Sequence, residues 1–340
     1  MKLFYYFVKQ FIGWLKNIRP NNMLCFLFLM IFLAYMTPQV GSYHIMGYIS
    51  SIGFFITFFF YGVSMSPSIF WNGISNWRLH LLVISSTFLI FPIVVLILRH
   101  FFETEFTNEI WLGIFYISVL PSTISSSVVM VSIAGGNIPA AIFNASISGV
   151  IGVFITPIWM GIFIANMIGE DKFSVFSSIC DLLIIIVLPL CLGMYFNKRW
   201  GELLAKNRKF LRLFDQSVIL LLVYTAFSKS FMSNAFDGFV ISQLLVLCVG
   251  IIILFFCVYM ITLIFCKIMG FNVADTITAL FCGSKKSLAH GIAMSKIIFA
   301  ELPSVGIILL PIMLYHAIQL LIVSIIAKRF ADKSQNVNNQ

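Results

Sequence analysis

Two adjacent lysines, Lys285 and Lys286, lie in the middle of a segment that is otherwise apolar enough to cross a bilayer, Phe281-Cys-Gly-Ser-Lys-Lys-Ser-Leu-Ala-His290. A charged side chain at bilayer depth costs roughly 2.5–3.5 kcal/mol on insertion scales, so it usually lies inside a helix bundle and carries function. Neighbouring side chains on a regular helix point about 100° apart. We therefore expect one lysine to face a cavity and the other to pair or to extend toward the interface. This pattern predicts a transporter or a channel.

A second polar cluster follows Pro121, inside another apolar segment. Its hydroxyl side chains are those of Ser122, Thr123, Ser125, Ser126 and Ser127. A helix break at Pro121, like one at Gly283 beside the lysines, would free backbone carbonyls that bind an ion or a substrate together with these hydroxyls. The alternative interpretation is a set of small residues that lets helices pack closely.

Three polar residues lie in the next apolar segment: Asn144, Ser146 and Ser148. Asn144 and Ser148 are four residues apart and share a helix face, so we expect them to face the hydroxyl cluster. They could contact a ligand, or they could only join two helices by hydrogen bonds.

His316 and Gln319 are three apart on one face of the last apolar segment, and either ligand contact or a hydrogen bond between helices explains them. Asp215 opens another segment, where a first-turn carboxylate would complement the helix dipole.

Ser284 and Ser287 flank the lysine pair, and a lysine beside a serine raises the alternative of a Ser–Lys hydrolytic dyad. No Gly-x-Ser-x-Gly elbow accompanies it, so we do not expect an enzyme. No His, Cys, Asp or Glu spacing is typical of a metal site, and no metal or cofactor is predicted.

The composition excludes a soluble protein. The chain has 340 residues, is 61% hydrophobic and is only 10% charged, whereas soluble domains carry about 25% charged residues. The net charge of +9 does not indicate a nucleic-acid partner, because the cations lie in short loops rather than on one surface. The partner implied by this composition is the lipid bilayer.

A membrane-crossing helix needs about 20 apolar residues, and ten segments meet that requirement approximately. They are residues 22–38, 46–64, 78–98, 110–133, 138–167, 176–196, 213–232, 239–266, 275–299 and 304–327. No linker is long enough to separate soluble domains, so residues 1–340 form one transmembrane domain that ends in a polar tail, 328–340.

The distribution of Lys and Arg predicts the orientation. Fifteen of the 21 cations fall in alternate loops and at the two termini, and only Arg99, Lys172 and Lys229 fall in the other loops. Cytoplasmic loops carry such an excess, so both termini are predicted to be cytoplasmic.

Ten spans divide into repeats of about 22–167 and 176–327, and an odd number of spans in each makes the repeats inverted. The fourth span of each repeat carries the polar interruption. At 1.5 Å per residue, Pro121 lies about 15 Å from one end of its span and the lysines about 15–17 Å from one end of theirs. Interrupted helices at matching positions predict a binding site near the midplane.

These motifs resemble the bile acid:sodium symporter superfamily, closest to its bacterial branch and to the seventh-member type of the human carrier group. The segments that carry the resemblance are Leu120-Pro-Ser-Thr-Ile-Ser-Ser-Ser127, Gly136-Asn-Ile-Pro-Ala-Ala141, Asp215 with Ile219-Leu-Leu-Leu-Val-Tyr-Thr-Ala-Phe-Ser228, Phe281-Cys-Gly-Ser-Lys-Lys-Ser-Leu-Ala289 and Leu310-Pro-Ile-Met-Leu-Tyr-His-Ala-Ile-Gln319.

The resemblance implies an all-α fold of ten helices in two inverted five-helix repeats, with unwound, crossing spans four and nine in a core that moves against a panel. It implies sodium-driven transport of a small or amphipathic organic anion across a bacterial inner membrane. The resemblance also implies sodium sites built from polar side chains on spans four and five and from a carboxylate with a nearby glutamine on span nine. The hydroxyls of Ser126, Ser127, Ser146 and Ser148 match the first set, whereas the span-nine carboxylate is absent.

Lys285 and Lys286 occupy the region of that missing carboxylate, and an ammonium group there would repel sodium or stand in for it. A channel or regulatory membrane protein without sodium coupling therefore stays open as the alternative to a symporter.

Overall fold

The computed structural model describes residues 22–65, 76–102, 105–123, 125–168, 174–236, 241–300, 302 and 304–338. Regular structure in these residues is helical, and no strand occurs among them. Seven helical stretches are long and apolar enough to cross a membrane, namely Ile45–Ser64, Trp77–Phe102, Ile138–Asn166, Val175–Lys206, Lys209–Met232, Ser242–Ile268 and Val305–Asp332. The chain is an all-helical, polytopic membrane protein, as its composition predicts.

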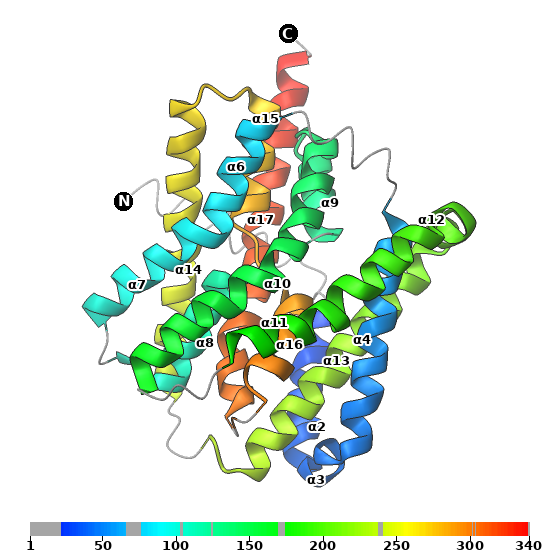
Figure 1. The fold of residues 1–340 in the computed structure, drawn as a ribbon. Coiled ribbons are helices and arrows are strands. Elements are labelled where there is room, and N and C mark those ends of the chain that lie inside the picture. Colours follow the sequence, from blue (N-terminus) through cyan, green and yellow to red (C-terminus); the bar gives the residue numbers. More distant parts are fainter. Residues whose placement is uncertain are drawn as a thin grey trace.

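Figure 1 shows the order of the helices along the chain. They are α2 (Asn22–Met36), α3 (Pro38–Ser42), α4 (His44–Ser64), α6 (Trp77–Ser85), the π-helical turn η1 (Ser86–Ile90), α7 (Phe91–Phe102), α8 (Asn108–Val119), α9 (Ser125–Ile133), α10 (Ile138–Ile168), α11 (Val175–Leu182), the π-helical turn η3 (Leu183–Val187), α12 (Leu188–Lys206), α13 (Arg208–Met232), α14 (Ile241–Ile268), α15 (Val273–Gly283), α16 (Leu288–Ile298) and α17 (Val305–Asn338).

Three of the ten predicted spans are not among the seven long helices, because each is short or divided. Helix α2 has 15 residues, α8 and α9 have 12 and 9, and α15 and α16 have 11 each. A crossing helix needs about 20. Helical geometry is absent at residues 120–123 and 284–287. The ten-span inverted repeat stays a prediction.

The helices pack in two groups. Helix α4 lies along α12, and α13 packs on α2, α3 and α4; we call these five helices the panel. Helices α6–α10 and α14–α17 form the second group, which we call the core group, and within it α17 packs on α8. In Figure 1 the panel lies at the lower right, and α13 and α16 meet where the two groups face each other.

Glycines allow helices α4 and α12 of the panel to touch. A Cβ atom added to Gly62 of α4 would lie 2.1 Å from the carbonyl oxygen of Leu190, and one added to Gly193 of α12 would lie 2.1 Å from that of Phe59. Small residues at helix contacts in membranes permit this close approach. The panel is therefore a closely packed unit.

A carboxylate joins three parts of the core group at the beginning of α15. Asp275 accepts hydrogen bonds from the side-chain amides of Asn137 at 2.8 Å, Asn76 at 2.9 Å and Asn272 at 3.1 Å. Asn76 precedes α6 and Asn137 precedes α10, so this carboxylate ties both segments to the first half of the interrupted segment α15–α16.

The interpretation of Asp215 as a first-turn residue is wrong. Helix α13 begins at Arg208, so Asp215 lies two turns inside it. Its side chain is half-buried and forms a side-chain hydrogen bond with Tyr61 of α4. Residues 197–212, which separate the predicted spans 176–196 and 213–232, are themselves mostly helical, because α12 and α13 continue through them with a break at Asn207.

Candidate functional site

The two segments without helical geometry, 120–123 and 284–287, meet inside the core group, and we call this meeting point the crossing. The backbone N–H of Ser287 donates to the carbonyl of Pro121 at 2.9 Å. The backbone N–H of Ser122 donates to the hydroxyl of Ser148, on α10, at 2.9 Å. Backbone groups that have left a helix need partners in a bilayer, and here each segment supplies them to the other.

Lys286 fills the centre of the crossing with its ammonium group. Its Nζ atom donates to the carbonyl oxygens of Thr87 and Ser118, both at 2.7 Å, and to that of Leu120 at 2.9 Å. The side chain is 0% exposed. The ring of Phe91 lies 4.2 Å from the same nitrogen. Three donors of one ammonium thus meet three acceptors, with an aromatic face on the remaining side.

The local backbone explains why a cation is stable there. Ser118 and Leu120 belong to the last turn and end of α8, where carbonyls have no partner within the helix. The partial negative charge of a helix C-terminus favours a cation. Thr87 lies in the π-helical turn η1, where the normal hydrogen-bond ladder is displaced. The protein therefore builds a cation position from backbone oxygens and fills it with its own side chain.

Gln319 and Tyr315 of α17 satisfy the unwound backbone beside Lys286. The Gln319 side chain accepts from the Lys286 N–H at 2.8 Å and donates to the Lys286 carbonyl at 2.7 Å. The Tyr315 hydroxyl donates to the carbonyl of Ser284 at 2.6 Å. Helix α17 thus fixes the path of residues 284–287.

Lys285 points to a different partner, the hydroxyl of Ser126, at 2.8 Å from its Nζ atom. The Thr123 hydroxyl lies 2.8 Å from that of Ser126 and 2.9 Å from that of Ser127. Lys285 is also 0% exposed, so neither lysine extends to an interface. The two ammonium groups enter two separate polar environments, one of carbonyls and one of hydroxyls.

The other predicted residues fall into two sets. Ser148 contacts the crossing directly, and the ring Nδ1 of His316 lies 3.0 Å from the Gln319 amide nitrogen. Asn144 and Ser146 bond instead to carbonyls of their own helix, Ala140 and Ile142. The buried Asn144 Oδ1 atom has no hydrogen-bond partner among the described residues. The side chain of Ser125 lies outside the described residues.

Ser284 and Ser287 use their hydroxyls locally. The Ser284 Oγ donates to the carbonyl of Leu280 at 2.6 Å, and the Ser287 Oγ accepts from the N–H of His290 as the N-cap of α16. Neither hydroxyl is bonded to a lysine among the hydrogen bonds of the described residues. The serine that contacts Lys285 is Ser126, whose hydroxyl accepts from its ammonium group.

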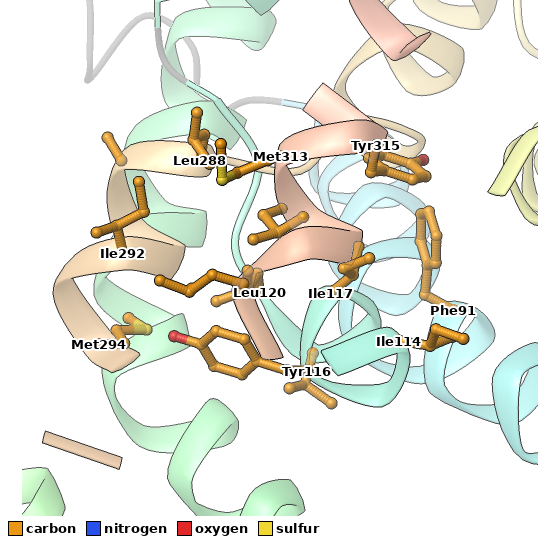
Figure 2. Close-up of a cluster of buried hydrophobic side chains, with 14 of the residues drawn as sticks. Phe91, Ile114, Tyr116, Ile117, Leu120, Leu288, Ile292, Met294, Met313 and Tyr315 are labelled. Carbon is orange, nitrogen blue, oxygen red and sulfur yellow. The ribbon is translucent and has the colours of Figure 1, made fainter. Parts of the chain in front are cut away.

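Apolar side chains close the crossing on the side of α16. Figure 2 shows Leu120, Leu288 and Ile292 grouped with Met313 around the point where α8, α16 and α17 come together. Phe91 and Tyr315 lie together at the other end of the same view, and their ring centroids are 6.0 Å apart. Excluding water from this region strengthens the interactions between the ammonium group and the carbonyls.

The sequence did not indicate the residues that hold Lys286. Its partners are backbone carbonyls, so the side chains of Thr87, Ser118 and Leu120 carry no signal. Gln319 and Tyr315 both belong to the motif Leu310–Gln319 that carries the resemblance, but the motif predicts no contact of either residue with the backbone of residues 284–287. A polar glutamine in an apolar helix was the one available signal.

The crossing carries the ammonium groups of Lys285 and Lys286. The hydrogen-bond partners found for both ammonium groups are neutral oxygens. In the described part of the chain, no group of three or more His, Cys, Asp or Glu residues could hold a metal ion.

These features define a polytopic helical protein with an interrupted, positively charged centre inside its core. The chain belongs to the SBF-like CPA transporter family, whose model matches residues 21–332. This confirms the resemblance predicted from the motifs.

Three relatives are similar over most of their length. Uncharacterized protein PA2026 of Pseudomonas aeruginosa is 35% identical over 92% of this chain and 94% of its own. Putative symporter YfeH of Escherichia coli is 32% identical over 84% of this chain and 85% of its own. Sodium/bile acid cotransporter 7 of Rattus norvegicus is 29% identical over 82% of both chains.

Proposed function

We propose that this protein is a secondary transporter of a small or amphipathic organic anion in which the Lys286 ammonium permanently occupies the position of a coupling cation. The observation that carries the proposal is the set of three backbone carbonyls around Nζ, at 2.7–2.9 Å, in a buried site. An ammonium group held by oxygens satisfies the same electrostatic demand as a bound cation.

The family supports the transport function, and the names of the relatives suggest the substrate class. One relative is named a sodium/bile acid cotransporter and another a putative symporter. Bile acids are amphipathic organic anions, so the substrate is expected to combine an apolar body with a negative head. The positive centre of the core group fits such a charge.

The ten-helix, two-repeat architecture belongs to the same proposal. The segments α8–α9 and α15–α16 would be spans four and nine of inverted repeats. The hydroxyls of Ser122, Thr123 and Ser127, together with Lys285, would form the midplane site. The core group would move against the panel during transport. Pro121 and Gly283 would set the two breaks.

Sodium coupling receives no support from the charge at the crossing. A sodium ion at the Lys286 position would meet an ammonium group a few ångströms away, where like charges repel strongly at low dielectric. A sodium ion bound by the hydroxyl cluster would likewise be repelled by the ammonium group of Lys285. We therefore propose a cycle that runs without sodium.

A channel or regulatory membrane protein is the second candidate, and the full hydrogen bonding of Lys286 favours it in one respect. A crossing whose hydrogen bonds are all satisfied is compatible with a rigid protein core as well as with a core that moves during transport. Saturable exchange of substrate across a membrane would exclude a simple pore.

The proposed setting is a bacterial inner membrane with both termini in the cytoplasm. Support comes from the excess of Lys and Arg in alternate loops. Reaction of single cysteines in the loop around Asn207 with an impermeant reagent would test this orientation. Labelling from the cytoplasmic side alone is expected.

Counterflow in proteoliposomes tests the transport function. Vesicles loaded with unlabelled taurocholate would be diluted into labelled taurocholate in sodium or choline buffer, and the same experiment would be repeated with other organic anions. We expect saturable uptake at equal rates in both buffers for at least one anion. Uptake that rises linearly with concentration would support a pore instead.

Lys286→Met is the matched variant for this measurement. It keeps an unbranched side chain only one atom shorter and removes the ammonium group. An unchanged rate, affinity and ion dependence would show that Lys286 has no role in transport.

A further inference from the structure

Helix α12 continues past the apolar part of its span into a strongly basic segment, residues 198–212. The continuous helical stretch Val175–Lys206 has 32 residues, which corresponds to about 48 Å at 1.5 Å per residue. The hydrocarbon core of a bilayer is about 30 Å thick, so the charged end of α12 lies at the level of the lipid head groups. The beginning of α13 follows directly after Asn207, and we call residues 195–213 the hairpin end.

Three cations of α12 share one face of the helix. At about 100° per residue, Lys198, Arg199 and Lys206 fall within an arc of about 100°, and all three side chains are exposed. Lys209, at the start of α13, is exposed as well. The basic segment contains six Lys and Arg residues but a single acidic residue, Glu202. The hairpin end therefore presents an excess of positive charge to its surroundings.

The opposite face of α12 is fixed to α4. The ring centroid of Trp200 lies 5.0 Å from that of Phe196 and 5.8 Å from that of Phe59. The side-chain amide of Asn197 donates to the carbonyl of Val63 at 2.7 Å. Packing within the panel thus sets the rotation of α12 about its axis, and the cations face away from the protein.

Large apolar side chains lie exposed close to these cations. Leu203 of α12 and Phe210 and Leu213 of α13 are each more than half exposed. Contact with water is unfavourable for such side chains, whereas the boundary between head groups and acyl chains accommodates apolar and basic side chains together. A partner that matches both has an anionic head group and apolar chains, as a phospholipid has. A soluble anion such as free phosphate lacks the apolar part.

We propose that the hairpin end binds anionic phospholipids of the surrounding leaflet, with Lys198, Arg199, Lys206 and Lys209 contacting the head-group phosphates. Each basic side chain at an anionic membrane surface strengthens binding about fivefold, so this set should prefer anionic over zwitterionic lipid. These lipids are constituents of the bilayer and not substrates. The surface lies on the outside of the panel and is separate from the crossing.

Binding at this surface would act on one of the two helix groups. Helices α12 and α13 both belong to the panel. In Figure 1 the end of α12 lies at the right edge of the view, away from α15 and α17 of the core group. An anionic leaflet would therefore hold the panel at a fixed depth while the core group moves. This mechanical role rests on the proposed transport cycle, whereas the lipid binding does not.

Quenching of tryptophan fluorescence by brominated lipids tests the assignment on the whole protein in vesicles. Trp200 is the reporter at the hairpin end, and its contribution is the difference between wild type and Trp200→Phe. Trp77, exposed at the beginning of α6 in the core group, is the reporter for a distant surface and is isolated by Trp77→Phe. Brominated phosphatidylglycerol and brominated phosphatidylcholine with the same acyl chains would be compared, with choline chloride as the salt.

Lys198→Gln/Lys206→Gln removes two cations from the exposed face of α12. Lys267→Gln/Lys328→Gln is the matched control, because these two lysines are exposed on core-group helices and are predicted to lie on the same side of the membrane. Lys198→Arg/Lys206→Arg retains both charges, so it separates an effect of charge from poor folding of the glutamine variant.

We expect phosphatidylglycerol to bind near Trp200 at least about fivefold more tightly than phosphatidylcholine, with a smaller preference near Trp77. Lys198→Gln/Lys206→Gln should lower the preference near Trp200 to less than about twofold, whereas the control and the arginine variant should retain it. Raising the choline chloride concentration should weaken the preference, because salt screens exposed charges.

The absence of a preference near Trp200, or an equal preference in wild type and Lys198→Gln/Lys206→Gln, would overturn the assignment. Glycerol phosphate in solution, at unchanged ionic strength, should leave the preference intact. Abolition of the preference by glycerol phosphate would overturn the choice of a lipid as the partner.

Counterflow on the same proteins separates this assignment from the proposed function. Counterflow by wild type without any preference for phosphatidylglycerol would overturn the lipid surface alone. A lysine-dependent preference without counterflow of any anion would retain the lipid surface and overturn transport.

Discussion

The side chain of Gln319 hydrogen bonds to both backbone groups of Lys286, accepting from its N–H at 2.8 Å and donating to its carbonyl at 2.7 Å. A single primary amide thus replaces the two helical hydrogen bonds that an unwound residue lacks. Gln319 is 0% exposed, so water does not substitute for it. Helix α17 thus supports the non-helical segment 284–287 that carries the lysine.

Gln319→Ala should therefore be strongly destabilising. It leaves a buried N–H and a buried carbonyl without partners, at about 1–3 kcal/mol each, so the free energy of unfolding should fall by about 2–4 kcal/mol. Thermal unfolding in detergent measures the loss. Gln243→Ala is the control, because that glutamine is half-buried and its Oε1 atom already lacks a partner. Equal effects of the two variants would contradict the supporting role of Gln319.

Asp275→Asn tests the three-asparagine contact at the start of α15. The variant replaces an acceptor-only carboxylate by an amide, which turns one N–H···O contact into a clash of two N–H groups. Hydrogen bonds to a charged group contribute about 1.5–3 kcal/mol, so a loss of about 2–4 kcal/mol is expected. Asp332→Asn, at an exposed position of α17, should change stability by less than about 0.5 kcal/mol. A loss no larger than that of the control would argue against this contact as a structural tie.

Gly193→Ala tests the close approach of α4 and α12. The new methyl group would lie 2.1 Å from the Phe59 carbonyl oxygen, which is backbone and cannot rotate away. The helices must separate, and overpacking of this kind typically costs about 1–3 kcal/mol. Gly250→Ala on α14, with no atom within 4 Å of the added methyl, should be neutral or stabilising by up to about 1 kcal/mol. Comparable melting temperatures for both variants would mean that the panel can move apart freely.

Much of the fold follows from hydropathy because a bilayer imposes it. Backbone groups must be satisfied within each apolar segment, so long apolar runs become helices with few alternatives. Seven of the predicted spans coincide closely with long helices of the structure. The start of α13 was misjudged because charged residues from Arg208 onward look like a loop, although helices continue readily through polar residues at an interface.

The partners of the lysines were beyond prediction for a different reason. Lys286 is held by carbonyls that lie 166–199 residues away along the chain, and any amino acid supplies a carbonyl. The sequence places Lys229 with the loop cations, at the end of the predicted span 213–232, and Lys296 within the predicted span 275–299. Both line one cavity, and this meeting depends on how α13 and α16 pack, which neither segment encodes alone.

The central claim is that the Lys286 ammonium takes the place of a bound cation, and a sodium titration of thermal stability tests it most directly. Wild type, Lys286→Gln and Lys286→Met would be titrated with sodium against choline at constant ionic strength, with Lys285→Gln as the neighbouring-lysine control. Glutamine adds one oxygen to the three carbonyls, whereas methionine fills the space without one.

A ligand at a hundredfold its dissociation constant stabilises a protein by about 2.7 kcal/mol, so a specific site is measurable. We predict no saturable sodium effect in wild type, in Lys286→Met or in Lys285→Gln, and a saturable stabilisation in Lys286→Gln. A saturable sodium effect in wild type, or none in any variant, would contradict the claim.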